Sequence, residues 1–185
     1  RGRKQYRYHP RWTEVRDQAK YDGLIAFANA LPAMRERVEA DMRRRTLDRN
    51  KVLGSIVWLL GNTFVRIGNT AYARDNRSFG LTTLRRRHLK VGSDGVRLKF
   101  TGKSGKDWNL SLTDRRIVRL VKACHELPGQ HLFQYLEDGD PHPVASHDVN
   151  AYIREISGSE FTSKHFRTWA GTVLAALALQ AFETF

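Results

Sequence analysis

Cysteine is nearly absent from the 185-residue chain, which contains only Cys124. A single thiol excludes an internal disulfide and any zinc site built on several cysteines. The seven histidines lack the His-Glu-x-x-His spacing of a zinc protease, and the glycine patterns that bind nucleotide phosphates are absent. The apolar stretch Val173–Leu179 is too short to cross a bilayer. We therefore expect no cofactor, no metal and no membrane partner, and we expect an intracellular protein that acts as a monomer.

Acidic residues are also scarce relative to basic ones. The 19 Asp and Glu residues face 32 Lys and Arg residues, which leaves a formal charge of +13. Such an excess attracts polyanions, and each neutralised phosphate of a nucleic acid releases condensed counterions. A bland basic surface, a ribosomal protein or a binder of anionic membranes would carry the same charge. The charge therefore indicates nucleic acid as the leading class of partner, but it does not indicate which reaction the protein catalyses.

The first half of the chain is predicted to be helical. Residues 1–12 are basic and aromatic and are expected to form a linker strap, whereas residues 13–47 show a charged helical pattern with a break at Leu31-Pro32. From about Asn50 to Ile67, apolar residues surround most of a helix, which indicates a central, buried element. Arg66 is predicted to lie on this helix. Because a buried unpaired charge is costly, it needs either an internal carboxylate or a phosphate as its partner.

A small β region is predicted next. The turn signals Ser93-Asp94-Gly95 and Gly102-Lys103-Ser104-Gly105 separate three short runs of β-type residues. Lys103 is expected to be exposed at the second turn, where the flanking glycines let the backbone approach a ligand closely. A lone lysine on a hairpin is more often a solubilising residue. The predicted strands of this antiparallel meander are His88–Val91, Val96–Phe100 and Trp108–Leu112.

The remainder is predicted to be helical around a loop. One helix is expected from Thr113 or Asp114 to about Glu126, and another from Ser146 or Asp148 to about Ile156, with prolines making the stretch between them mostly loop. The last helix is expected to begin near Thr162 or Ser163. Its predicted buried stripe is Phe166, Trp169, Ala170, Val173, Leu177 and Ala181.

Three cations are thus predicted on rigid elements. Arg167 is expected in the first turn of the last helix, where the helix dipole opposes a cation and favours a bound anion. Phosphoryl transfer without a metal needs a set such as Arg66, Lys103 and Arg167. Arginines donate in bidentate fashion to nonbridging oxygens as charge develops, and a lysine can protonate the leaving oxygen.

Five short motifs, three of which contain these residues, follow one another along the chain, and each is weak alone. Together, and in this order, they resemble the successive motifs of the poxvirus and bacterial type IB DNA topoisomerases, over nearly the whole chain. The motifs are Gly2-Arg3-Lys4-Gln5-Tyr6, Arg66-Ile67-Gly68-Asn69 followed by Tyr72, Gly80-Leu81-Thr82-Thr83-Leu84, Phe100-Thr101-Gly102-Lys103 and Phe166-Arg167-Thr168.

The resemblance implies a mainly α (α+β) fold, in which a multi-helical catalytic domain carries a three-stranded antiparallel sheet, as in tyrosine recombinases and type IB topoisomerases. It implies that Arg66 and Arg167 bind the scissile phosphate and that Lys103 protonates the 5′ oxygen. The implied reaction is the relaxation of supercoiled double-stranded DNA through a transient nick, a 3′-phosphotyrosyl bond, strand rotation and religation, without ATP or metal.

Further residues are expected to contact DNA. Tyr72 matches a DNA-contacting tyrosine of the family. Arg85 belongs to the run Arg85-Arg86-Arg87, for which a solvated strand edge is an alternative interpretation. In residues 1–12, basic side chains are expected to contact phosphates, while Gln5 and Tyr6 reach bases or sugars. The expected DNA contacts are Arg3, Lys4, Gln5, Tyr6, Tyr72, Arg85, Lys106 and Lys164.

The chain departs from the family pattern after Arg167. The family places a histidine and the nucleophilic tyrosine some tens of residues beyond this arginine, but no tyrosine or histidine follows Arg167 here. We expect residues 13–185 to be a catalytic domain cut before its nucleophile, and residues 1–12 to follow a missing N-terminal domain. His165 stands where the family often has an acidic residue, and a surface histidine without a role is expected there.

Two other functions fit the same residues. A tyrosine recombinase uses similar cations but typically has a histidine three residues before the second arginine, where this chain has Lys164. A non-catalytic basic module could bind DNA with the same fold and no nucleophile. Sequence downstream of Phe185 would separate that module from the enzyme.

Overall fold

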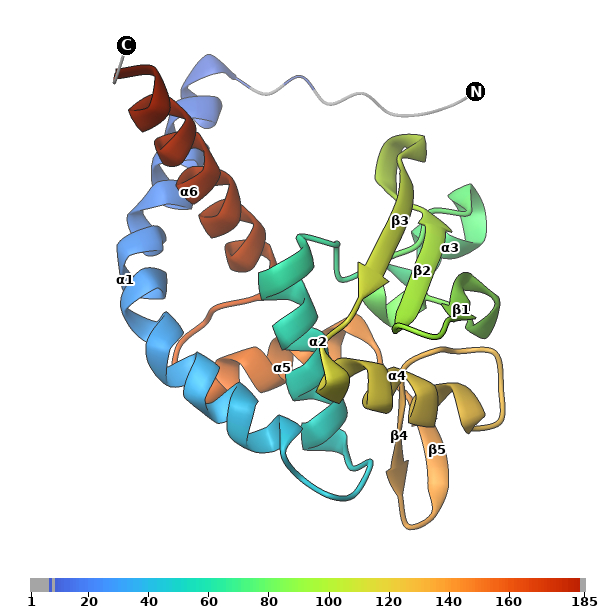
Figure 1. Cartoon of the computed structure of the whole chain (residues 1–185). Helices are drawn as coiled ribbons and strands as arrows, with labels where there is room; N and C mark the ends of the chain where they lie inside the picture. Colours follow the sequence, from blue (N-terminus) through green and yellow to red (C-terminus); the bar gives the residue numbers. More distant parts are fainter. Residues whose placement is uncertain (1–6, 8, 184–185) are drawn as a thin grey trace.

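The computed structural model of the chain describes residue 7 and residues 9–183. It is mainly helical with a small three-stranded sheet, which confirms the expected fold class (Figure 1). The helices in this part are α1 (Pro10–Met42), α2 (Arg49–Thr63), α3 (Thr70–Asn76), α4 (Arg115–Glu126), α5 (Ser146–Ser157) and α6 (Ser163–Glu183). The strands are β1 (Leu89–Val91), β2 (Val96–Thr101), β3 (Asp107–Leu112), β4 (Gln134–Glu137) and β5 (Asp140–Pro143). Short 3₁₀ turns are η1 (Leu81–Thr83), η2 (Arg86–His88) and η3 (Lys103–Gly105).

Helix α1 runs without interruption through the break expected at Leu31-Pro32. A proline inside a helix costs roughly 3 kcal/mol because it removes a hydrogen bond and crowds the preceding turn. Here Pro32 is exposed, while Leu31 and Met34 on either side of it are buried in the core. Tertiary packing of the apolar face therefore outweighs the local preference, and the predicted break was wrong.

Helix α2 is central and buried as predicted, but it ends four residues early. Asp48 caps its first turn by accepting a hydrogen bond from the amide of Lys51 at 3.0 Å. Phe64 adopts a left-handed conformation with φ 58° and ends the helix. The backbone then turns away, and the carbonyls of Arg66 and Ile67 accept from the amides of η1 instead. The prediction that Arg66 lies on a buried helix was therefore wrong, since it is exposed in the segment after α2.

The three-stranded meander is confirmed, with strand order β1-β2-β3 and antiparallel pairing throughout. In β2, Val96, Leu98 and Phe100 are buried, whereas Arg97 and Lys99 between them are exposed. This alternation turns one face of the sheet to the core and the other to solvent. The turn of the β2–β3 hairpin, η3, lies at the end of these two strands.

A second, two-stranded antiparallel sheet lies in the region predicted to be mostly loop. Strands β4 and β5 are joined by Asp138 and Gly139, whose φ values are 52° and 90°. An Asp-Gly pair favours such a two-residue turn, because both positions need positive φ. The prolines of β5 argued against a strand, but an edge strand tolerates them. The predicted helices on either side, α4 and α5, are confirmed.

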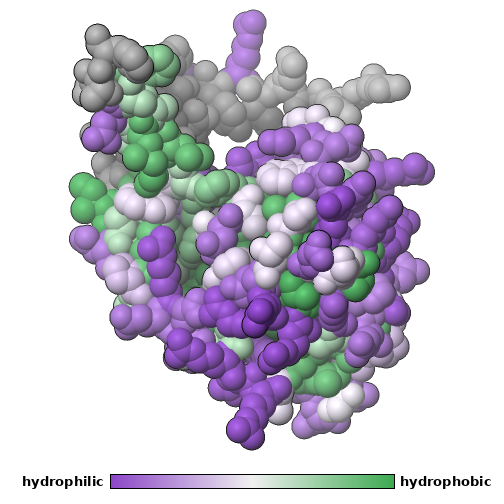
Figure 2. Space-filling view, in the orientation of Figure 1, coloured by the Kyte–Doolittle hydropathy of each residue, from purple (hydrophilic) through white to green (hydrophobic). Residues whose placement is uncertain are grey.

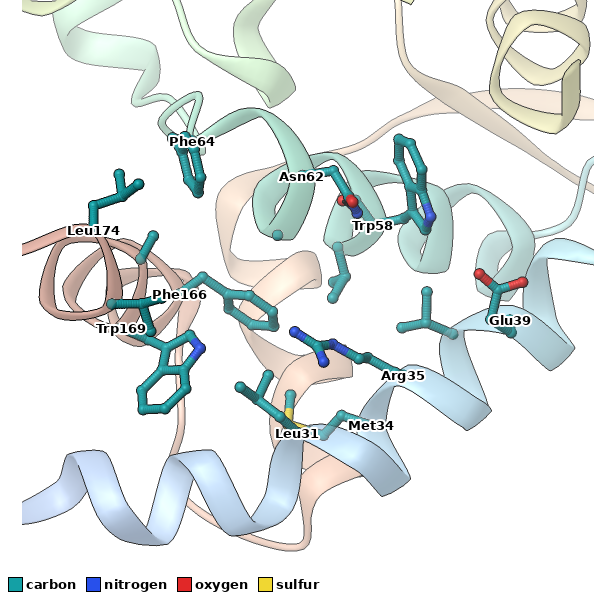
Figure 3. Close-up of a pocket in the computed structure, with 15 residues that line it drawn as sticks. Leu31, Met34, Arg35, Glu39, Trp58, Asn62, Phe64, Phe166, Trp169 and Leu174 are labelled. Carbon is teal, nitrogen blue, oxygen red and sulfur yellow. Dashed lines mark hydrogen bonds between the residues drawn. The ribbon is translucent and has the colours of Figure 1, made fainter. Parts of the chain in front are cut away.

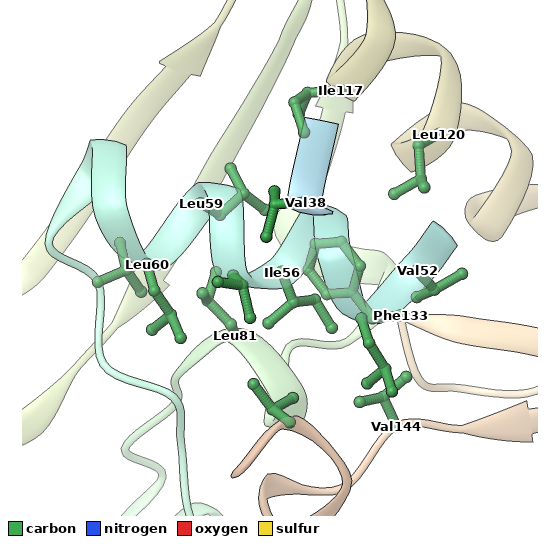
Figure 4. Packing of buried hydrophobic residues seen from close by; sticks show 14 of the residues in the cluster. Val38, Val52, Ile56, Leu59, Leu60, Leu81, Ile117, Leu120, Phe133 and Val144 are labelled. Atoms are coloured by element: carbon green, nitrogen blue, oxygen red, sulfur yellow. The ribbon is translucent and has the colours of Figure 1, made fainter. Parts of the chain in front are cut away.

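One continuous hydrophobic core joins α1, α2, α5, α6 and the inner face of the sheet (Figure 4). Ile56, Leu60 and Leu81 meet near its centre and are almost fully buried. One polar link crosses it: the Tyr152 hydroxyl of α5 donates to the buried Asp41 carboxylate of α1 at 2.8 Å. Burial, together with this hydrogen bond, raises the pKa of Tyr152. The core therefore fixes the end of α2 against the start of α6.

Helix α6 is buried only in its first half. Phe166 is buried and Trp169 is partly buried, as predicted, but Leu177 is 57% exposed and Ala181 is also exposed. The apolar stripe is therefore buried only as far as about Val173. Periodicity shows which face of a helix is apolar, but it does not show how much of that face another element covers. Figure 2 shows the apolar surface of α6 at the upper left. None of the described helices has the length and apolar character needed to span a membrane.

Candidate active site

The segment that carries Arg66 is held in place by η1. The amide of Leu81 donates to the Arg66 carbonyl at 2.9 Å, and the amide of Thr82 donates to the Ile67 carbonyl at 2.8 Å. Gly80 allows this close approach, since a Cβ built there would lie 2.5 Å from the Arg66 carbonyl oxygen. The motif that begins at Gly80 thus positions the motif that contains Arg66.

The β2–β3 turn presents Lys103 and Lys106. Within the turn, the amide of Gly102 donates to the Lys106 carbonyl at 2.7 Å, and Ser104 has a left-handed φ of 61°. A Cβ at Gly102 would meet the indole nitrogen of Trp108 at 2.7 Å, so glycine is required there. The Lys106 ammonium lies 4.9 Å from the centroid of the Trp108 ring, a cation–π contact. Lys103 is exposed on this turn, as predicted.

Helix α6 begins in a set of aromatic contacts that fix its start. His165 Nδ1 accepts from the amide of Thr162 at 3.0 Å, and its ring packs against Phe27 and Phe161. This side chain caps the helix and is partly buried, so the expectation of a surface histidine without a role was wrong. Arg167 follows on the second turn rather than on the first, and it is partly buried.

One cavity of about 290 Å³ brings Arg66, Lys103 and Arg167 together. Lys106 and Trp108 also line it. A neighbouring hollow is lined by Arg66 and Arg167 together with Lys164. The structure therefore gathers in one place the three cations that the sequence analysis singled out, from the segment after α2, from the sheet and from α6.

Arg66 and Arg167 line the cavity and the neighbouring hollow together, and no acidic side chain among the described residues lines either. No ion pair between described side chains includes Arg66, Lys103 or Arg167. Nη1 of Arg167 is buried and has no hydrogen-bond partner among the described atoms. Burial, and then the charge of Arg66, lower the pKa of Arg167 below its usual value. Two crowded guanidinium groups of this kind suit a dianionic or monoanionic oxygen cluster, such as a phosphodiester.

Of the other expected DNA contacts that the structure describes, only the two lysines line the cavity or the hollow next to it. Tyr72 lies on α3 and is 60% exposed. Arg85 lies outside the cavity, where its Nη1 donates to the Gln130 side chain at 2.6 Å. Lys106 and Lys164 line the cavity and the neighbouring hollow, respectively. Arg3, Lys4, Gln5 and Tyr6 lie outside the described residues.

Aromatic side chains complete the cavity, and sequence reasoning missed them. Phe79, Phe100 and Trp108 line it, although Phe100 was expected only in a strand and in the Lys103 motif, and Trp108 only in a strand. Trp108 lies two residues after Lys106 on β3, and the Phe100 and Trp108 rings stack at 6.0 Å between centroids. A tryptophan at a hairpin turn next to lysines was the available signal for a contact with a sugar or a base.

An apolar groove of about 540 Å³ adjoins the cavity between α1, α2 and α6 (Figure 3). Leu31, Phe166 and Trp169 project into it, and Phe64 and Leu174 lie where it meets the cation-lined cavity. Among the described residues, no group of three or more His, Cys, Asp or Glu side chains could hold a metal ion. The groove itself is mainly apolar, whereas the cavity next to it carries the three cations.

Comparison with known proteins agrees with this geometry. The family model described as "Eukaryotic DNA topoisomerase I, catalytic core" matches residues 9–184. The chain is 33% identical over 184 residues to a DNA topoisomerase 1B of Acanthamoeba polyphaga mimivirus, which covers 97% of this chain and 55% of the relative. It is 24% identical over 141 residues to the DNA topoisomerase 1B of Vaccinia virus, covering 75% of this chain and 45% of that protein.

The chain thus spans about half the length of the curated relatives that it matches. Its family match covers nearly all of the chain, including the three motifs that carry Arg66, Lys103 and Arg167. The chain belongs to the type IB DNA topoisomerase family, and it matches that family's catalytic core.

Proposed function

We propose that the protein relaxes supercoiled double-stranded DNA by nicking one strand, allowing it to rotate and resealing it, without ATP or a metal ion. Its relatives in mimivirus and Vaccinia virus are named DNA topoisomerase 1B, which supports the assignment. In this proposal residues 1–185 supply the groups that bind and protonate the phosphodiester, and a tyrosine outside these residues is the nucleophile. Tyr72, Tyr135 and Tyr152, whose side chains are described, do not line the cation-lined cavity.

In this reaction the two arginines have one role and the lysine has another. Arg66 and Arg167 bind the nonbridging oxygens of the scissile phosphate and stabilise the charge that builds on them. The tyrosine hydroxyl releases its proton to water as its oxygen bonds to phosphorus, the bond from phosphorus to the 5′ oxygen breaks, and the Lys103 ammonium gives its own proton to that oxygen. Resealing reverses each step. No external energy source is needed, because the phosphotyrosyl bond conserves the energy of the phosphodiester.

The observation that carries the proposal is the unpartnered guanidinium of Arg167. A buried donor without a partner costs about 1–3 kcal/mol, and more if it is charged. Arg167 carries such a donor at Nη1 beside the like charge of Arg66. A fold tolerates this arrangement when an anion fills the site during function, as a phosphodiester would here.

Cleavage of a short duplex by the whole protein, under single-turnover conditions at saturating DNA, tests these roles. We expect Arg66→Ala and Arg167→Ala each to slow cleavage about 10²-fold or more, as does loss of other oxyanion donors. Arg119→Ala is the matched control, because Arg119 is exposed on α4 and does not line the cavity. Cleavage by both cavity variants at the rate of the control would show that the phosphate binds elsewhere.

A sulfur atom in place of the bridging 5′ oxygen separates the role of Lys103 from that of the arginines. A thiolate leaves without protonation, so we expect this substrate to restore the cleavage rate of Lys103→Ala and not that of Arg167→Ala. Equal rescue of both variants would contradict the assignment of Lys103 as the proton donor.

A non-catalytic DNA-binding module is the second candidate, since no tyrosine follows Arg167 in residues 1–185. The two are distinguished by denaturing the protein after incubation with labelled duplex. The enzyme leaves label covalently attached to protein through tyrosine, whereas a binding module leaves none.

A further inference from the structure

A second cluster of arginines lies apart from the three cavity cations. Arg85, Arg86 and Arg87 precede β1, and Arg77 ends α3; all four line one depression of about 770 Å³. The guanidinium of Arg87 lies 5.9 Å from the centroid of the Phe79 ring, which holds it at the edge of this depression. Figure 2 shows hydrophilic side chains over the region of α3, β1 and β2 that Figure 1 locates at the right.

This cluster lacks the carboxylates that accompany the other arginine run of the chain. At the end of α1, Arg44 of the run Arg43–Arg45 pairs with Asp48 at 2.7 Å and lies 3.9 Å from Asp41. In the run Arg85–Arg87, by contrast, no ion pair between described side chains is formed, and Arg85 bonds only to a neutral amide, that of Gln130. The middle arginine of one run is thus neutralised within the fold, whereas no arginine of the other run is paired with a described carboxylate.

Backbone geometry at Arg77 gives a second indication. Arg77 has a φ of 51°, a left-handed conformation that glycine or asparagine usually adopts at the end of a helix. Any side chain with a Cβ is strained in this conformation, whereas glycine is not. The residue is therefore better explained by where it places its guanidinium, beside Arg87 in the same depression.

Two histidines next to the cluster have lowered pKa values. Burial, and then the charges of Arg87 and Arg85, lower the pKa of His88 to about 4. Burial and the charge of Arg85 also lower the pKa of His131, whose Nδ1 is buried without a partner among the described atoms. Both imidazoles are thus neutral at pH 7, and the excess charge belongs to the arginines alone.

The arginine cluster is continuous with the cation-lined cavity. Phe79 lines both depressions and also a hollow between them, to which Arg77, Arg87 and Lys99 contribute. Cationic side chains therefore follow one another from Lys103 and Lys106, past Phe79, to Arg86. Asp107 also lines the intermediate hollow, but it forms no ion pair with a described cation, and the row of cations matches the row of phosphates on one nucleic-acid backbone.

We propose that Arg77, Arg85, Arg86 and Arg87 form a second phosphate-binding site, which holds the backbone of the same DNA duplex at a distance from the cleavage point. This inference rests on the proposed function for the identity of the polyanion. The cluster contributes affinity and orientation and takes no part in bond breaking, since it lies outside the cavity that contains Arg66, Lys103 and Arg167.

The test measures the binding of a fluorescent duplex by the whole protein over a range of salt concentrations. The variant Arg86→Gln/Arg87→Gln is compared with Arg43→Gln/Arg45→Gln, which removes the same number of charges from residues that line neither the cavity nor these depressions. Each lost phosphate contact lowers the slope of log K against log salt concentration by about 0.9, so we expect a decrease of up to ~2 for the first variant and none for the second. Equal slopes for the two variants would overturn the proposal.

Two further measurements distinguish failure of this proposal from failure of the proposed function. At saturating DNA, the Arg86→Gln/Arg87→Gln variant should cleave at the wild-type rate, unlike Arg167→Ala; a lost cleavage rate at saturation would place the cluster in the chemistry and contradict the proposal. If the variant binds a first duplex normally and fails only to capture a second one, the cluster serves a different duplex and the proposal is wrong. Failure of the wild-type protein to cleave at all would overturn the proposed function. The salt dependence of binding would still show whether the cluster contacts phosphates.

Discussion

Gly80 supports the position of Arg66, and its replacement by alanine tests that support. The φ of Gly80 is −148°, an extended conformation open to any residue, so the effect of Gly80→Ala is purely steric. The new Cβ would lie 2.5 Å from the Arg66 carbonyl oxygen and 2.5 Å from the Gly68 amide nitrogen. Both contacts are with backbone, which cannot rotate away as a flexible side chain can.

The size of the effect follows from these distances. Contact at 3.4 Å is ordinary, so the two segments must separate by nearly 1 Å. This movement stretches the bonds from Leu81 and Thr82 to the carbonyls of Arg66 and Ile67, now 2.9 and 2.8 Å. Overpacking of this kind costs about 1–3 kcal/mol of stability, and a misplacement of roughly 1 Å at a catalytic group costs about 10²-fold in rate.

The assay pairs thermal unfolding with single-turnover cleavage by the whole protein. Gly23→Ala is the matched control, since nothing lies within 4 Å of its new Cβ and alanine favours the helix by up to ~1 kcal/mol. We expect Gly80→Ala to unfold at lower temperature and to cleave about 10²-fold more slowly, and Gly23→Ala to do neither. A Gly80→Ala protein with wild-type stability and rate would refute the reasoning that η1 positions Arg66.

Three further predictions concern the folded chain. Tyr152→Phe removes the hydrogen bond to the buried Asp41 carboxylate and should lower the free energy of unfolding by about 1.5–3 kcal/mol in urea; an unchanged midpoint would show that the bond contributes nothing. Because Cys124 is fully buried and burial raises its pKa to about 11, native protein should resist thiol reagents at pH 8 and react once unfolded. The pKa of His88 is lowered to about 4 and that of His131 is also lowered, so between pH 6.5 and 4 the unfolded chain binds more protons than the folded one. Stability should therefore be constant between pH 7 and about 8 and should fall as pH decreases through that window, and a flat profile would contradict this.

Much of the fold could be predicted because local signals agreed with the tertiary structure. The alternation Val96, Leu98, Phe100 and the two glycine-containing turns define the meander without reference to the rest of the chain. Asp114 caps α4 by accepting from the amides of Arg116 and Ile117, as its position before an apolar pattern indicated. In such places the residues that form an element also mark its ends.

The errors in α1 and α2 have a common cause, since both were decided by contacts between residues far apart in the sequence. Periodicity extended α2 to Ile67, but hydrogen bonds from Leu81 and Thr82 pull this segment out of the helix. Local preference broke α1 at Pro32, where burial on the opposite face holds it together. The cations of the site were found by residue type and motif order, whereas their convergence in one cavity depends on packing that no local pattern records.

Relaxation of a supercoiled plasmid by the whole protein, in EDTA and without ATP, tests the central claim most directly. The account predicts complete relaxation by the wild-type protein and by Arg119→Ala, and a rate at least about 10²-fold lower for Arg66→Ala and Arg167→Ala. A strict requirement for Mg²⁺ or ATP, or wild-type relaxation by both cavity variants, would contradict it.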